Sequence, residues 1–182
     1  GMSDSFRTAL VSGKLGGVDG VSLEVNKWVQ ILESQGHQVF TIAGRYAGRL
    51  EEIPRERQLI CEPIRFNSPE QRNYETTVFP YLSRRPPHLT EEQLREFVQE
   101  LETHGREVAN LIMELIQEHR IDVLVGQNTN AMPMTLLGGL AMYRLATEER
   151  VATIFHHHDF WWERSRFSNA RTETLLNRSM PP

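Results

Sequence analysis

The chain has 182 residues, of which 39% are hydrophobic and 24% charged, an ordinary composition for one globular domain rather than two. Its net charge of −4, with the histidines neutral, provides no basic field for nucleic acid or an anionic membrane. The single cysteine excludes an internal disulfide and a cysteine-rich zinc site, and it suits a cytoplasmic protein. No apolar run reaches the length of about 18 residues that a membrane span needs.

Residues 6–44 predict a strand, a tight turn, a helix and a second strand. Residues 6–13 are a short β-prone run that leads into the glycine-rich stretch GKLGGVDG. A helix closed by Gly36 follows, because apolar residues recur with helical spacing at Val21, Val25, Trp28, Val29 and Leu32. The second strand is expected at residues 38–44. This order is that of a βαβ unit.

The middle of the chain predicts a third strand around residues 59–61 and then an irregular excursion over residues 63–88. Prolines interrupt the excursion, but it has apolar residues to bury, namely Tyr74, Val78, Phe79 and Tyr81. A long insertion of this kind is often a binding loop. Thr90 and Gln93 then match a capping box, which opens one long helix that runs through Gly105 to His119.

The last third predicts an apolar strand that breaks into polar residues over residues 121–130, a helix with Pro133 in its first turn that runs towards Thr147, and a final strand in VATIFHH. A short helix around residues 172–178 follows. Because nearly continuously apolar strands alternate with helices, we expect an α/β, Rossmann-like three-layer sandwich with a mostly parallel sheet covered on both faces. Ligands bind beyond the carboxyl ends of such strands, so GKLGGVDG, GQNTN and HHHDFWWER should share one cleft.

Two of these stretches leave structural and functional interpretations open. Gly16 and Gly17 either present backbone amides at a helix N-terminus to a phosphate or only make the turn tight. Asn128 either binds a hydroxyl or caps the turn after its strand, whereas Asn130 is expected to cap the next helix. His37, His88, His104 and His119, at surfaces or helix ends, are assigned no chemistry.

The stretch HHHDFWWER has three interpretations. The first is a metal site. On an extended backbone His156 and His158 face one side and His157 the other, so two imidazoles and Asp159 would be available to a metal. However, no HExxH helix or distant cysteine supplies further ligands. In the second interpretation Phe160, Trp161 and Trp162 form a buried aromatic plug, and hydrogen bonds satisfy the histidines. The third interpretation is a strand end that presents imidazole and carboxylate to a polar substrate. Glu163 and Arg164 either pair with neighbours or reach the cleft.

Several motifs occur together along nearly the whole chain: Gly16-Gly17-Val18 after the first strand, GHQVFTIAG after the first helix, and IDVLVGQN followed by a strand that ends in His158-Asp159. This combination resembles the N-terminal half of GT-B glycosyltransferases, particularly the retaining enzymes of glycosyltransferase family 4 (group 1). HHHDFWWERSRF is also similar to the longer HDFxWER motif of a subset of these proteins.

The resemblance implies roles for individual residues. The glycine-rich loop of that family approaches the donor diphosphate or a charged acceptor, which corresponds to Gly16 and Gly17. A histidine at the end of the later strand contacts the transferred sugar, which corresponds best to His158, with Asp159 as its polar partner. The register within the triple histidine is open, so His156 or His157 can occupy that place.

The resemblance also implies a nucleotide-sugar co-substrate, a small-molecule or glycan acceptor, and a C-terminal donor-binding domain. No counterpart of that domain precedes Pro182, so residues 1–182 are expected to form the acceptor-side domain and, alone, neither to bind the donor tightly nor to turn over. No metal or other cofactor is expected. The alternatives are a non-catalytic Rossmann-like module that binds sugars or phosphates and a metal-dependent hydrolase centred on His156, His158 and Asp159.

Overall fold

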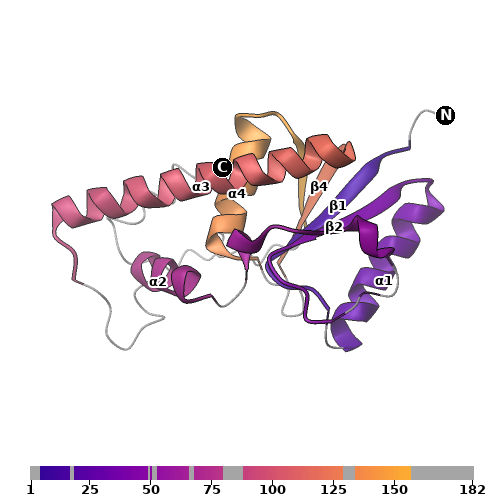
Figure 1. Ribbon diagram of the computed structural model, residues 1–182, viewed down its shortest axis with the longest axis horizontal. Coiled ribbons are helices and arrows are strands. Elements are labelled where there is room, and N and C mark those ends of the chain that lie inside the picture. Colours follow the sequence, from indigo (N-terminus) through magenta and orange to yellow (C-terminus); the bar gives the residue numbers. More distant parts are fainter. Residues whose placement is uncertain are drawn as a thin grey trace.

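The computed structural model describes residues 5–16, 19–48, 50, 53–65, 68–79, 88–128 and 134–156 (Figure 1). Within these ranges the strands form one five-stranded sheet in the order β3-β2-β1-β4-β5, and every neighbouring pair is parallel. The strands are β1 Arg7–Ser12, β2 Gln38–Ala43, β3 Gln58–Ile60, β4 Val123–Gln127 and β5 Ala152–His156. The helices are α1 Asp19–Ser34, α2 Pro69–Val78, α3 Glu91–His119 and α4 Leu136–Thr147, with single 3-10 turns η1 Arg55–Arg57 and η2 Glu62–Ile64.

The central strands are buried on both faces, which explains their nearly continuous apolar sequences. On one face α1 packs its Val25 and Val29 against Leu10, Val39 and neighbouring residues. On the opposite face α3 and α4 cover the sheet, and their buried side chains join those of Phe40 and Leu124 in a second cluster. The predicted α/β, Rossmann-like fold with helices on both faces is therefore confirmed.

Helix α3 is the longest element, and Figure 1 shows that it extends well beyond the sheet to reach α2. Its N-terminus has the predicted capping box, in which the Thr90 side chain accepts a hydrogen bond from the Gln93 amide and the Gln93 side chain accepts one from the Thr90 amide. The helix continues through Gly105, as expected from the apolar spacing. Among the described residues, no helix combines the length and apolarity that crossing a bilayer requires.

The interpretation of residues 63–88 as wholly irregular is wrong, because this stretch contains α2. Ser68 caps the helix by accepting a hydrogen bond from the Gln71 amide, and Pro69 occupies the first helical position. Tyr74, Val78 and Phe79 are buried as predicted, in a cluster between α2, α3 and α4. Helix formation allows the excursion to bury these side chains while its backbone groups stay paired.

The expected start of α4 is also wrong. The helix begins at Leu136, and Thr135 is its N-cap, so Pro133 precedes the first turn and Asn130 is not the cap. Threonine and asparagine are both favoured N-cap residues, and the sequence alone did not separate them. The interpretations that concern Tyr81 and a helix at residues 172–178 lie outside the described residues.

Candidate functional site

Three of the predicted polar stretches leave the sheet at one edge. Strands β1, β4 and β5 are neighbours, with Val11 paired to Gly126 and Gln127 paired to His156. Because all three strands are parallel, the stretches that follow them begin at adjacent carboxyl ends. Gly17, His157, His158, Asp159, Glu163 and Arg164 lie outside the described residues, so the cleft and the roles predicted for them remain predictions.

Gly16 lies in a turn that packs closely against the loop after β2. Its φ is +85°, and a Cβ at this position would lie 3.1 Å from the Gly48 carbonyl oxygen. The preceding Leu15 donates its amide to the Arg45 carbonyl and accepts from the Ala47 amide. The left-handed backbone and the close approach both favour glycine here. A structural reason for Gly16 therefore exists, whereas a contact with phosphate remains a prediction.

Asn128 follows β4 directly and reaches across the connection to α4. Its Oδ1 accepts a hydrogen bond of 3.1 Å from the backbone amide of Met134. This contact closes the connection over six residues and holds the end of β4 next to the start of α4. The geometry supports the capping interpretation of Asn128, and binding of a substrate hydroxyl stays a prediction.

Helix α4 is anchored at this edge by Thr135. The hydroxyl of Thr135 accepts a hydrogen bond from the Gly138 amide at 3.3 Å and donates one to the Ile64 carbonyl at 2.8 Å. Thr135 is 1% exposed and Ile64 is fully buried. One buried hydroxyl thus caps α4 and joins it to η2.

The carboxyl end of β2 is covered by the chain itself. The Cys61 amide donates to the Ala43 carbonyl, and η2 then crosses the strand end. A Cβ added to Gly44 would lie 2.2 Å from the Arg65 backbone nitrogen, so the two backbones are in direct contact. The edge is therefore closed at β2, and a ligand site at the ends of β1, β4 and β5 stays a prediction.

Helix α2 is attached to this edge by two polar side chains that the sequence did not single out. The side-chain amide of Gln71 donates a hydrogen bond of 2.9 Å to the Pro63 carbonyl, and its Oε1 accepts one of 3.5 Å from the Leu137 backbone amide. Burial raises the pKa of Glu75, partly offset by a hydrogen bond from the Leu136 backbone amide. Tyr74 and Glu75 lie three and four residues after Gln71, so that the three share one face of α2, and this spacing could have identified Gln71 and Glu75 if the helix had been predicted.

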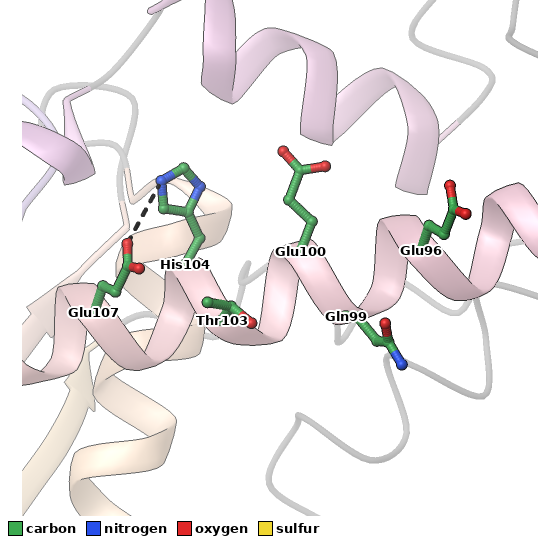
Figure 2. Close-up of a pocket in the computed structure, with 6 residues that line it drawn as sticks. All are labelled: Glu96, Gln99, Glu100, Thr103, His104 and Glu107. Carbon is green, nitrogen blue, oxygen red and sulfur yellow. Dashed lines mark ion pairs between the residues drawn. The ribbon is translucent and has the colours of Figure 1, made fainter.

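A second polar cluster lies on α3, and none of the predicted site residues that the structure describes contributes to it. An open groove of about 430 Å³ is lined by Glu96, Gln99, Glu100, Thr103, His104 and Glu107, and Figure 2 shows Glu100, His104 and Glu107 along one side of the helix. His104 was placed with the histidines at surfaces or helix ends and assigned no chemistry, but it is half-buried in the middle of α3. In the described part of the chain, no group of three or more His, Cys, Asp or Glu side chains is arranged to hold a metal.

The chain is similar to two curated proteins along nearly its whole length. It is 29% identical over 179 residues to the mannosylglucosylglycerate synthase of Thermotoga maritima, which covers 97% of this chain and 38% of that protein. It is 26% identical over 177 residues to the mannosylglucosylglycerate synthase of Petrotoga mobilis, which covers 95% of this chain and 37% of that protein. The chain thus spans less than two fifths of the length of these relatives. No family model matches it.

Proposed function

We propose that the chain is the N-terminal, acceptor-side part of a GT-B glycosyltransferase that transfers a sugar from a nucleotide-sugar donor with retention, as in glycosyltransferase family 4. The observation that carries the proposal is the similarity over 97% of the chain to a mannosylglucosylglycerate synthase. The name of that relative describes a product assembled from mannosyl, glucosyl and glycerate groups. A sugar-transfer reaction that builds an anionic glycoside is the function we propose by similarity.

The Rossmann-like sheet supports this proposal through its topology. The edge formed by β1, β4 and β5 carries the stretches that contain Gly16, Asn128 and His156, while η2 covers the end of β2. A ligand at this edge would meet the turn that contains Gly16 and Gly17 on one side. The stretch after β5, with His158 and Asp159, would lie on the other.

The proposed chemistry divides the work between two domains. Backbone amides at Gly16 and Gly17 would stabilise the charge that develops on the leaving diphosphate. His158, supported by Asp159, would contact the transferred sugar, and Glu163 and Arg164 would bind substrate. A C-terminal domain would bind most of the nucleotide, and closure of the cleft would align the donor with the acceptor and exclude water.

The experiment that tests the proposal uses the product of the complete open reading frame that contains this chain. It is incubated with UDP-glucose or GDP-mannose and with glycerate or glucosylglycerate, and new glycosides are detected by mass spectrometry. We expect transfer from one of these donors, with the anomeric configuration retained when the product is examined by NMR. Absence of transfer with every combination contradicts the proposed substrate class, and ligand binding without turnover favours a non-catalytic module.

Single alanine variants of the three adjacent histidines separate their roles in the same assay. We expect His158→Ala to lower kcat by about 100-fold or more, the range typical of a lost acid-base or polar contact at a reaction centre. His157→Ala is the matched control and should have little effect, because an extended backbone would turn its side chain away from that of His158. A larger effect at His156 or His157 than at His158 would assign the sugar contact to that residue instead.

A further inference from the structure

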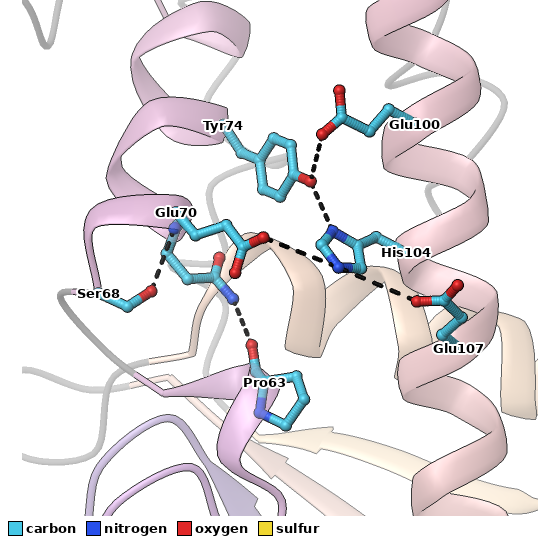
Figure 3. Close-up of polar contacts among 8 residues, drawn as sticks. Pro63, Ser68, Glu70, Tyr74, Glu100, His104 and Glu107 are labelled. Atoms are coloured by element: carbon cyan, nitrogen blue, oxygen red, sulfur yellow. Dashed lines mark hydrogen bonds and ion pairs between the residues drawn. The ribbon is translucent and has the colours of Figure 1, made fainter.

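Helices α2 and α3 meet at a polar contact centred on His104. Tyr74 of α2 places its hydroxyl 2.5 Å from His104 Nδ1 and 3.2 Å from Glu100 Oε1. The other imidazole nitrogen, Nε2, lies 3.8 Å from Glu70 of α2 and 4.0 Å from Glu107 of α3. Figure 3 shows the imidazole between the two helices, with these groups around it.

His104 has two neutral tautomers and one protonated form, and these differ in how many of the four contacts they satisfy. If only Nε2 carries a proton, Nδ1 must accept the Tyr74 hydroxyl proton, and Glu100 then faces a phenol oxygen without one. If only Nδ1 carries a proton, Tyr74 can donate to Glu100, but the lone pair of Nε2 faces two carboxylates. The imidazolium alone donates at both nitrogens, so that Tyr74 accepts from His104 and donates to Glu100.

The surroundings of this contact also favour a cation. In the described part of the chain, the charged groups that face the His104–Tyr74 pair are Glu70 from α2 and Glu100 and Glu107 from α3. Helix α4 adds apolar side chains to the adjoining cluster, among them Leu137 and Leu140. Tyr74 is 2% exposed, so its hydroxyl depends on these protein partners.

We propose that His104 is a protonation-dependent latch that holds α2 against α3. The imidazolium completes the chain of hydrogen bonds and faces the carboxylates, whereas each neutral tautomer leaves one repulsive contact. The docked helix is therefore favoured at low pH, where the imidazolium forms, and this contribution is lost as the pH rises. Histidine is the side chain whose charge ordinarily changes close to neutrality.

The latch would act on the candidate site through α2. Gln71, on the same helix, contacts the Pro63 carbonyl and the Leu137 amide next to the carboxyl edge of the sheet. Release of the α2–α3 contact loosens the helix that supports η2 and the start of α4. This inference concerns how α2 is held and does not depend on the proposed transferase activity.

Hydrogen–deuterium exchange of the 182-residue chain tests the proposal, with peptides from α2 as the readout. Protection factors, which correct for the intrinsic pH dependence of exchange, are compared at pH 6.0 and pH 8.5. We expect α2 to be about tenfold more protected at pH 6.0 than at pH 8.5, the change expected when one charge-assisted hydrogen bond is lost. Peptides from α1 report whether the rest of the chain stays folded.

Three variants distinguish the latch from a general effect of pH. His104→Gln should abolish the difference, and Tyr74→Phe, which keeps the aromatic ring but removes the hydroxyl, should reduce it. His119→Gln changes a histidine at the C-terminal end of the same helix and should leave the pH difference intact. Equal protection of wild-type α2 at both pH values overturns the proposal, as does a pH difference that survives in His104→Gln or disappears in His119→Gln.

Discussion

Replacing Thr135 by alanine tests whether one buried hydroxyl anchors α4 at the carboxyl edge of the sheet. The substitution removes the N-cap of α4 and also removes the donor to the Ile64 carbonyl. Loss of an N-cap costs about 1 kcal/mol, and a buried carbonyl without its donor costs about 1–3 kcal/mol. We therefore expect the free energy of unfolding to fall by about 2–4 kcal/mol, or the melting temperature by about 4–16 °C.

Urea unfolding followed by circular dichroism at 222 nm measures this loss, with two matched controls. Thr135→Ser keeps the hydroxyl and loses one methyl group, so its cost should stay near ~1 kcal/mol. Thr147→Ala removes an exposed hydroxyl from the opposite end of α4, where it bonds the Tyr143 carbonyl, and should cost less than about 0.5 kcal/mol. A loss for Thr135→Ala no larger than that for Thr147→Ala, or a serine variant as unstable as the alanine variant, refutes the reasoning.

Two further predictions concern backbone contacts and alkaline stability. Gly44→Ala places a Cβ 2.2 Å from the Arg65 backbone nitrogen, so it should lower the free energy of unfolding by more than about 4 kcal/mol or prevent folding. Gly36→Ala has open space around it but a φ of +86°, so in urea unfolding it should lower this free energy by only about 1–2 kcal/mol. Burial raises the pKa of Tyr46 above the ordinary value of about 10, so the unfolded chain ionises first and stability should fall as the pH rises above ~10. In Tyr46→Phe this alkaline fall should be shallower, as measured by urea midpoints at pH 8 and pH 11.

The sequence predicted the helices and strands in which apolar residues follow a clear pattern. The apolar spacing of α1 and α3 and the continuous apolar strands correspond to elements with large buried faces. Helix α2 was missed because its inward face mixes polar and apolar residues, with Gln71 and Glu75 beside Tyr74 and Val78. Gln71 is buried and Glu75 half-buried because Pro63 and the start of α4 satisfy their polar atoms, and the start of α4 is distant in the sequence.

The candidate site was predictable only as far as topology determines it. Parallel strands in alternation with helices place the ends of β1, β4 and β5 at one edge, which the sequence pattern indicated. The contacts of Gly16 with Gly48 and of Asn128 with Met134 depend on loop conformation and were not predictable. His104 was overlooked because its partners Tyr74 and Glu70 are on a helix that the sequence pattern did not reveal.

Asn128 has two possible roles, closing the connection to α4 through Met134 and binding a substrate hydroxyl. Loss of activity in a variant of Asn128 is informative only if the variant separates these roles. Asn128→Asp keeps the oxygen that accepts from the Met134 amide, so the free energy of unfolding should change by less than about 1 kcal/mol. Asn128→Ala removes this acceptor and should cost about 1 kcal/mol or more. In the complete open reading frame product, a role in closing the connection to α4 predicts that activity follows stability, so Asp retains more than Ala. If Asn128 instead donates its side-chain amide to a substrate hydroxyl, the two variants lose activity equally although Asp is the more stable. Parallel measurement of the urea midpoint and kcat/KM for both variants therefore assigns the residue to one role.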